Sequence, residues 1–251
     1  MTKNLIYTVA VNHETSQFKN TDYSQYCLMS WKKWCKKRNI DFLVIDEHNP
    51  RYKFPVWNKD TIFEIVGDTY DKIGYVDSDT MVHWDAPNPF DLYDDEWCWT
   101  KDISNLRWIS NSIDYFQKFY PNKSLDIYDY YNSGISFFTK EHKPIFDNLI
   151  KLYENNSEEL DDVATWGGGK VQTILNYELQ NHDIKVKELS SQWNMFAMHK
   201  KEMFNHNWQD GDDKTPFFIK YSWIWHFTGF PIEQRTSIMK QTWDLVGKNY
   251  E

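Results

Sequence analysis

The sequence predicts an α/β protein whose central sheet is mainly parallel and flanked by helices. Short apolar runs suited to buried strands alternate with amphipathic stretches of helical period through the first third of the chain. The chain has 251 residues, of which 41% are hydrophobic, and this is enough for one substantial core. No linker or repeat divides the sequence, so we expect a single domain that spans residues 1–251.

The first 80 residues carry the clearest alternation of strand and helix. We predict strands at Leu5–Val11, Asp41–Ile45 and Lys72–Asp77, separated by helices near Asp22–Arg38 and Trp57–Val66. The first helix places four residues at core spacing, namely Tyr23, Cys27, Trp31 and Trp34. Strands joined by helices pair in parallel, and such sheets bind ligands beyond the carboxyl ends of their strands.

Residues 81–251 look mixed, with strands and helices in a less regular order. The expected strands are Glu96–Lys101, Ile135–Thr139, Ile184–Leu189 and the aromatic-rich run Phe217–His226. The expected helices are Asn111–Phe119, Ile145–Tyr153, Val171–Gln180 and Ile232–Val246.

The composition of the chain indicates its compartment and which classes of partner are disfavoured. A formal net charge of −9 disfavours a broad electrostatic grip on nucleic acid. The three cysteines form no Cys-x-x-Cys pair, so they favour neither a disulfide framework nor a zinc ribbon, and we expect a cytoplasmic protein. We expect no membrane span, because no run approaches the ~18 continuous apolar residues that one requires, and no secretory signal precedes the first strand.

Two acids, Asp77 and Asp79, stand one residue apart where the third predicted strand meets solvent. A strand end that breaks into a loop turns both carboxylates toward one point, and hard oxygen ligands suit Mg²⁺ or Mn²⁺. Such a site remains incomplete until a substrate diphosphate adds further oxygens. The alternative is a pair of acids that caps or solvates a turn.

Four separated motifs resemble those of glycosyltransferases with the A-type (GT-A) fold. They are YDKIGYVDSDT at 70–80, YNSGI at 131–135, SQWN at 191–194 and WHFTG at 225–229. Their order and spacing are similar to the retaining family that contains glycogenin and the bacterial lipopolysaccharide galactosyl- and glucosyltransferases. The resemblance implies a Rossmann-like, mainly parallel sheet with a mixed α+β second half, in which residues 1–80 bind nucleotide and residues 81–251 bind donor sugar and acceptor.

The resemblance also implies a ligand set for the metal, formed by Asp77, Asp79 and the late histidine His226. Mn²⁺ accepts imidazole as well as carboxylate, and either Mn²⁺ or Mg²⁺ would offset the charge that develops on the departing diphosphate. Taken alone, His226 would be interpreted as a hydrogen-bonded histidine among aromatic residues.

Further family positions map onto this chain one by one. The resemblance implies that six residues bind the nucleotide or the donor sugar, namely Val9, Asn12, Lys59, Ser78, Asn132 and Gly229. It assigns catalytic positions near the reacting sugar to Asp102 and Gln172. Each polar residue also has a structural alternative: Lys59 as a solvated helix residue, and Asn132 and Asp102 as turn residues.

The chain departs from the family pattern at two of these places. Val171 stands where many members have an acid before Gln172, which puts one sugar hydroxyl contact in doubt. Ile232 stands where the family commonly has a lysine that holds the diphosphate, and Arg235 or Lys240 are candidates to compensate. The glycine-rich residues 167–170 lack the spacing of a phosphate-binding loop, so we interpret them as a mobile loop.

The predicted function is transfer of a hexose from a nucleoside diphosphate sugar to an acceptor hydroxyl with retention of configuration. A UDP-sugar is the favoured donor and a GDP-sugar stays open, because Val11 lies near the position where some relatives carry a base-contacting acid. Two alternatives remain, a carbohydrate-binding protein without catalysis and a sugar nucleotidyltransferase. The acceptor, a glycan or another hydroxyl-bearing substrate, is not readable from residues 194–216.

Overall fold

The computed structural model describes residues 2–14, 22–103, 105–166, 169–196 and 215–251. Within these residues a central sheet of six strands has the order β2-β1-β3-β6-β5-β7. The strands are β1 (Asn4–Val9), β2 (Asp41–Ile45), β3 (Lys72–Val76), β5 (Trp97–Lys101), β6 (Tyr131–Thr139) and β7 (Val186–Glu188). β6 runs antiparallel to both of its neighbours and the other pairs are parallel, which confirms the mainly parallel sheet.

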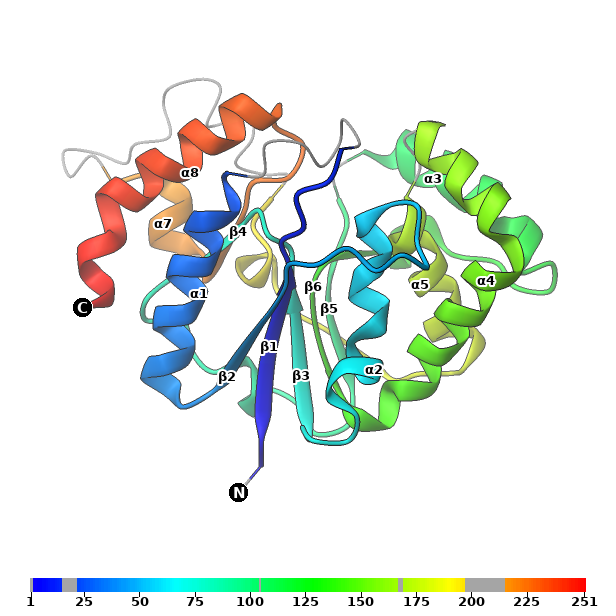
Figure 1. Ribbon diagram of the computed structural model, residues 1–251, viewed down its shortest axis with the longest axis horizontal. Helices are drawn as coiled ribbons and strands as arrows, with labels where there is room; N and C mark the ends of the chain where they lie inside the picture. Colours follow the sequence, from blue (N-terminus) through cyan, green and yellow to red (C-terminus); the bar gives the residue numbers. More distant parts are fainter. Residues whose placement is uncertain (1, 15–21, 104, 167–168, 197–214) are drawn as a thin grey trace.

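Helices cover both faces of this sheet (Figure 1). On one face lie α1 (Ser24–Arg38), α7 (Phe217–Tyr221) and α8 (Ile232–Val246). On the other face lie α2 (Ile62–Val66), α3 (Leu106–Phe116), α4 (Lys143–Trp166) and α5 (Lys170–Asn181). Among the described helices, none combines the length and the apolar character needed to cross a membrane.

Two hydrophobic cores follow from the alternation of side chains along the strands. In β1, Ile6 packs into the core beneath α1 and α8, whereas Leu5 and Tyr7 pack into the core beneath the helices of the opposite face. Gly74 leaves room for two side chains of the first core on the neighbouring strands, because a Cβ there would lie 2.6 Å from Ile6 Cδ1 and 2.7 Å from Phe137 Cδ1. The predicted core positions of α1 are all buried.

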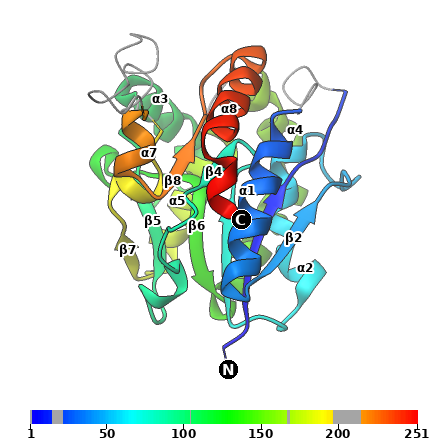
Figure 2. The ribbon, with the colours of Figure 1, turned by 90° about the vertical axis from the view of Figure 1, so that its left-hand side faces the viewer.

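A second, two-stranded sheet joins β4 (Thr80–Val82) to β8 (Ile224–His226) in antiparallel register. It lies beside α1 and α7, seen face-on from that side in Figure 2. Thr80 pairs with His226, so residues 146 positions apart in sequence become neighbours. The sequence analysis missed β4, which has three residues and begins one residue after the paired acids.

Several predicted elements were wrong in type or extent. The run Phe217–His226 is a short helix followed by β8, and within the helix the rings of Phe217 and Tyr221 make a tilted contact at helical spacing, with centroids 5.0 Å apart. The predicted helix at Trp57–Val66 is mostly a 3₁₀ segment, Pro55–Thr61, that leads into α2.

Other errors concern boundaries. The first strand ends at Val9 rather than Val11, and the short strand near the end of the sheet covers only Val186–Glu188. Three elements are longer than predicted: α3 begins at Leu106, β6 begins at Tyr131, and α4 continues to Trp166 through a kink at Asn156.

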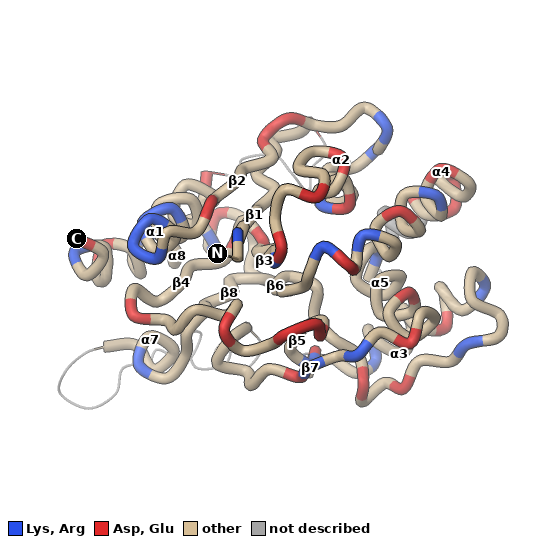
Figure 3. The backbone as a smooth tube through the Cα atoms, turned by 90° about the horizontal axis from the view of Figure 1, so that it is seen from below, with Lys and Arg blue, Asp and Glu red and all other residues tan. Residues whose placement is uncertain are grey.

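The basic residues of α1 gather toward its carboxyl end, whereas acidic and basic residues are interspersed over most other elements (Figure 3). Lys36, Lys37 and Arg38 lie in the last turn, where positive charge complements the helix dipole. Lys37 pairs with Asp85 at 3.4 Å, and the Arg38 guanidinium lies 4.3 Å from the Trp34 ring centroid. These contacts give the basic residues a local structural role.

Candidate metal and donor site

The paired acids lie in a tight turn that connects β3 to β4. The backbone N–H of Thr80 donates to the carbonyl oxygen of Asp77 at 3.1 Å, and the Thr80 hydroxyl donates to the same oxygen at 2.7 Å. Trp31 Nε1 on α1 donates to the Thr80 hydroxyl at 3.0 Å and so holds the turn from beneath. The turn directs the side chains of Asp77 and Asp79 to a common point.

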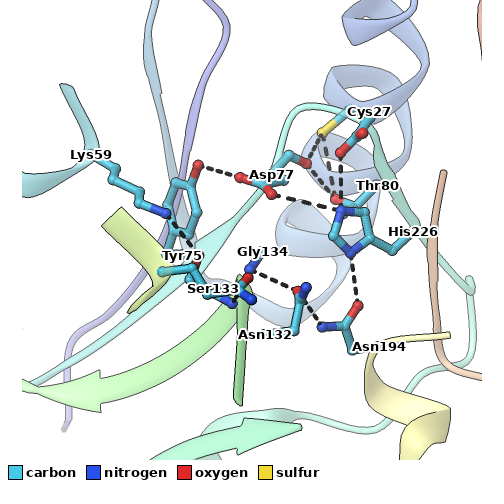
Figure 4. Close-up of polar contacts among 12 residues, drawn as sticks. Cys27, Lys59, Tyr75, Asp77, Thr80, Asn132, Ser133, Gly134, Asn194 and His226 are labelled. Atoms are coloured by element: carbon cyan, nitrogen blue, oxygen red, sulfur yellow. Dashed lines mark hydrogen bonds and ion pairs between the residues drawn. The ribbon is translucent and has the colours of Figure 1, made fainter. Parts of the chain in front are cut away.

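His226 enters this point from β8 because its strand pairs with β4. Its Nε2 lies 3.2 Å from Asp79 Oδ1 and 3.6 Å from Asp77 Oδ2 (Figure 4). The candidate ligand atoms of the three residues all lie within 4.8 Å of one another. Asp79 and His226 are buried, whereas Asp77 is partly open to solvent.

A chain of hydrogen bonds fixes the tautomer of His226. Asn132 Nδ2 donates to Asp102 Oδ2 at 3.1 Å, and a carboxylate only accepts, so the Asn132 oxygen must face the other way. That oxygen accepts from Asn194 Nδ2 at 3.0 Å, which turns Asn194 Oδ1 toward His226 Nδ1 at 2.8 Å. Nδ1 therefore carries a proton and donates it to Asn194, and Nε2 is the nitrogen that faces the acids.

Two observations show that this site fits a divalent cation. His226 Nε2 is buried, points at the two carboxylates and makes no well-aligned hydrogen bond to any described residue, which is costly unless something binds it. Gly134 leaves room beside the ligands, since a Cβ there would lie 2.3 Å from His226 Cε1 and 2.7 Å from Asp77 Oδ2. Two carboxylates and a neutral imidazole are a ligand set suited to Mn²⁺, and to Mg²⁺ with less preference for the nitrogen.

The two acids have different electrostatic surroundings. Burial alone would raise the pKa of Asp79, but Arg235 at 3.0 Å and His226 hold it well below its usual range, so Asp79 stays ionised. Asp77 Oδ1 accepts from the Tyr75 hydroxyl at 2.5 Å. Burial and the nearby charge of Asp77 raise the pKa of Tyr75, so the phenol remains a donor to this carboxylate.

Lys59 lies inside the protein on the 3₁₀ segment, which excludes the alternative of a solvated lysine. The residue is 6% exposed, its Nζ donates to Ser133 Oγ at 3.1 Å, and the same nitrogen lies 4.9 Å from the Tyr75 ring centroid. Tyr75 lies between Lys59 and Asp77, since its ring is next to the lysine nitrogen and its hydroxyl donates to Asp77 Oδ1 (Figure 4). An ammonium in this place complements a phosphate.

Asp102, Asn132 and Gln172 form one polar cluster, although they come from the end of β5, from β6 and from α5. Asp102 Oδ2 accepts from both amides, at 3.1 Å from Asn132 Nδ2 and 3.0 Å from Gln172 Nε2. Gln172 Oε1 accepts from the Ser133 backbone N–H at 3.0 Å. β6 is antiparallel to its neighbours, so its amino-terminal end reaches the sheet edge where β3 and β5 finish.

Of the remaining residues predicted to bind the donor, two line a hollow beside the acids and two do not. Val9 and Ser78 line a hollow of about 70 Å³ beside Asp77, together with Val11, Tyr23, Pro55, Val56 and Tyr75. Asn12 is exposed and is not among these lining residues. Gly229 is an exposed turn residue with φ of 79°, two positions after Phe227, whose N–H donates to the Asp79 carbonyl oxygen at 2.9 Å.

Sequence reasoning missed the site roles of Asn194, Tyr75 and Gly134, although each lies inside a motif that it singled out. Of the two cations considered in place of a lysine at position 232, Arg235 reaches the site, whereas Lys240 is exposed and pairs with Asp244 at 2.6 Å. Residues 167–168 of the predicted mobile loop at 167–170 and residues 197–214 of the unassigned region 194–216 fall outside the described residues, whereas Lys170 is buried and begins α5.

No family model matches the chain, and no curated protein matches it in sequence. Solved structures do match. One is a glycosyltransferase involved in the glycosylation of the major capsid of PBCV-1, with 14% identity and a TM-score of 0.59 over 95% of this chain and 99% of that chain. Another is the bifunctional glycosyltransferase WbbM, with 13% identity and a TM-score of 0.55, in which the match spans about half (52%) of that chain and 100% of this one.

A third match is an active-site mutant of LgtC, with 14% identity and a TM-score of 0.50 over 96% of this chain and 99% of that chain. At these identities the likeness establishes the architecture. The chain therefore has the A-type glycosyltransferase fold that its motifs predicted.

Proposed function

We propose that the protein is a metal-dependent glycosyltransferase that moves a hexose from a nucleoside diphosphate sugar to an acceptor hydroxyl. The observation that carries the proposal is the convergence of His226 Nε2 with the carboxylates of Asp77 and Asp79, whose candidate ligand atoms lie within 4.8 Å of one another at the sheet edge where this fold binds ligands. A non-catalytic carbohydrate-binding protein would have no use for such a diphosphate-metal site.

Asp77, Asp79 and His226 would hold Mn²⁺ or Mg²⁺, and a bound divalent ion supplies Lewis-acid stabilisation of the charge on the leaving diphosphate. Lys59 adds a fixed positive charge from the other side of Tyr75. The hollow lined by Val9 and Ser78 lies next to Asp77, and we assign it to the nucleoside. Its apolar walls suit a base, with uracil favoured and guanine as the alternative.

The cluster of Asp102, Asn132 and Gln172 would orient the donor sugar. A carboxylate accepts hydrogen bonds from sugar hydroxyls, and an amide both donates and accepts. Gln172 would place its amide oxygen near the anomeric carbon, where positive character develops. In the free protein that oxygen accepts from Ser133 N–H, which holds the side chain in position.

Retention of configuration is what the family resemblance implies, and the neutrality of Gln172 bears on how it would be achieved. An amide does not form a stable glycosyl ester, so we favour direct transfer over double displacement. The bond from the anomeric carbon to the diphosphate oxygen breaks while the bond to the acceptor oxygen forms on the same face. The leaving phosphate oxygen takes the acceptor proton.

The proposal also includes a cytoplasmic location and a separate binding role for each half of the chain. Cys27, Cys35 and Cys98 are buried free thiols, which supports a reducing cytoplasm. Residues 1–80 would bind nucleotide and residues 81–251 the donor sugar and acceptor.

The test is nucleotide release from a panel of UDP- and GDP-sugars with Mn²⁺ and without acceptor, beside an Asp79→Ala variant. Slow hydrolysis of one donor that disappears in the variant is expected, and it would identify the sugar. If no donor is hydrolysed and calorimetry finds no metal-dependent nucleotide binding, the enzyme proposal is wrong and a carbohydrate-binding protein takes its place.

A further inference from the structure

Arg235 reaches the metal site from α8, and the structure uses it in a way that the family pattern does not suggest. Its Nη1 lies 3.0 Å from Asp79 Oδ2, and its Nη2 donates to the Phe230 carbonyl oxygen at 3.1 Å. The guanidinium carbon lies 5.0 Å from the Tyr23 ring centroid, and the side chain is 17% exposed. The guanidinium is thus held on three sides.

The two oxygens of Asp79 face different partners. Oδ2 receives Arg235, whereas Oδ1 faces His226 Nε2 at 3.2 Å, on the side where the metal ligands converge. Arg235 therefore blocks one oxygen and leaves the other for a cation. A divalent ion can bind Asp79 through Oδ1 without displacing the guanidinium.

We propose that Arg235 makes metal binding depend on the nucleotide, so that the cation binds weakly alone and tightly only with a diphosphate. This inference rests on the metal-diphosphate function proposed above. Arg235 is a positioning and charge-setting residue in it, and it acts on the metal through Asp79.

The charges of the site give the reason. Apart from Lys59, which lies on the other side of Tyr75, the charged groups that meet at this point are the carboxylates of Asp77 and Asp79 and the guanidinium of Arg235. They sum to one negative charge, a weak attraction for a divalent cation. With the cation bound the sum becomes one positive charge, which attracts a diphosphate. Without Arg235 the acids would carry two negative charges, bind the cation strongly and leave a neutral site with less attraction for the nucleotide.

The position of this arginine also fits the departure at residue 232. Ile232 is partly buried against the core, and Arg235 lies three residues later on the same helix, one turn along. The positive charge of Arg235 is therefore paired with Asp79 in the free protein, rather than exposed at the surface where a diphosphate would bind.

The experiment measures two affinities for each variant of the full chain: Mn²⁺ alone, from the loss of the free-ion electron paramagnetic resonance signal, and UDP at saturating Mn²⁺, by calorimetry. For Arg235→Gln we expect Mn²⁺ alone to bind about tenfold tighter and UDP to bind about tenfold weaker. Lys240→Gln is the matched control, because it removes one positive charge from the same helix at an exposed ion pair with Asp244. It should leave both affinities unchanged.

Arg235→Lys separates charge from packing. It keeps the positive charge, so Mn²⁺ alone should bind within about threefold of the wild type. The proposal is wrong if Arg235→Lys changes the Mn²⁺ and UDP affinities as much as Arg235→Gln does. It is also wrong if Arg235→Gln leaves the Mn²⁺ affinity unchanged or weaker. Melting curves establish that each variant is folded.

A measurement on the wild type keeps the proposal testable if Arg235→Gln does not fold. UDP should tighten Mn²⁺ binding at least about a hundredfold, because each ligand supplies charge that the other lacks. Equal Mn²⁺ affinity with and without UDP would overturn the role of Arg235 while leaving a metal site in place. A wild type that binds neither Mn²⁺ nor UDP would instead refute the proposed function itself.

Discussion

Asn194 Oδ1 accepts the proton of His226 Nδ1 at 2.8 Å, and this hydrogen bond decides which imidazole nitrogen faces the two acids. The orientation of Asn194 depends in turn on Asn132, which is anchored by Asp102. Asp102, which is expected near the donor sugar, is thus linked to His226, which is expected to bind the metal, through the side-chain amides of Asn132 and Asn194. Hydrogen bonds to the far nitrogen of a metal-binding histidine commonly set its affinity.

Asn194→Ala should weaken Mn²⁺ binding, measured with UDP present, by about ten- to a hundredfold. Without the acceptor at Nδ1 the imidazole can place its proton on Nε2 and lose the lone pair that faces Asp79. Gln192→Ala, which removes an exposed side-chain amide two residues away, should leave the affinity unchanged. Equal Mn²⁺ affinity in Asn194→Ala and wild type would show that the tautomer is fixed by other groups.

Gly134→Ala should abolish metal-dependent nucleotide binding. The added methyl group would lie 2.3 Å from His226 Cε1 and 2.7 Å from Asp77 Oδ2, so both ligands would have to move. Overpacking of this kind also lowers the free energy of unfolding by about 1–3 kcal/mol. Calorimetry of UDP binding with Mn²⁺ and urea denaturation measure the two effects.

Gly67→Ala is the control for that loss of stability. Gly67 has a φ of 54°, but a methyl group added there would meet no neighbouring side chain or backbone atom within 4 Å, so the substitution strains the backbone far from the site. It should lower stability and preserve nucleotide binding. Normal metal-dependent binding by Gly134→Ala would contradict the assignment of this space to the cation.

Asp102→Asn should separate nucleotide binding from action on the sugar. UDP with Mn²⁺ should bind within about twofold of the wild type, because the new amide oxygen can still accept from Asn132 Nδ2 and so keep the hydrogen bonds that lead to His226. Donor hydrolysis should fall about a hundredfold, because the sugar cluster loses its negative charge. Asp129→Asn, at an exposed acid that pairs with Lys101 at 2.9 Å, should leave both unchanged. A large loss of UDP affinity in Asp102→Asn would place this residue at the nucleotide rather than at the sugar.

Asp60 predicts a pH dependence of stability. Burial raises its pKa from 3.8 to about 7, against a smaller opposing effect of Lys59, and no described residue makes a hydrogen bond to its Oδ2. Below pH 4 the folded and unfolded chains both bind the proton. As the pH rises toward 7 only the unfolded chain releases it, so the stabilisation that Asp60 contributes in acid is lost over this window.

Asp60→Asn should therefore raise the free energy of unfolding by about 1–4 kcal/mol at pH 8 and by less at pH 5, as measured by urea denaturation. The exposed Asp68→Asn should change little at either pH. The same shift for Asp60→Asn at both pH values would show that Asp60 is ionised throughout, or protonated throughout.

The sequence predicted the parts of the fold that local patterns determine. The apolar run before Asp77, the strand Asp41–Ile45 and the helix Ile232–Val246 have clear periods and clear ends, and the structure confirms them. The prediction of a strand over the whole aromatic run Phe217–His226 was wrong. Phe and Tyr favour strands on average, whereas Phe217 and Tyr221 contact each other at helical spacing in this segment.

The sequence predicted which residues form the metal site, but it did not predict the tertiary contacts that position them. Asp77 and Asp79 were found because they lie together in the sequence, and His226 because its motif resembles a family pattern. Asn194 and Arg235 depend on tertiary contacts: the bridge between Met195 and Trp225 sets the position of the first, and the docking of α8 against α1 sets that of the second. No local pattern records either contact.

The most direct test of the central claim is calorimetric titration of UDP into the protein with Mn²⁺ and with a chelator, for the wild type and His226→Ala. We predict that the wild type binds UDP only with Mn²⁺, and that His226→Ala loses this binding while remaining folded. UDP binding that is equal with Mn²⁺ and with the chelator, or that survives intact in His226→Ala, would contradict the assignment of Asp77, Asp79 and His226 as the metal site.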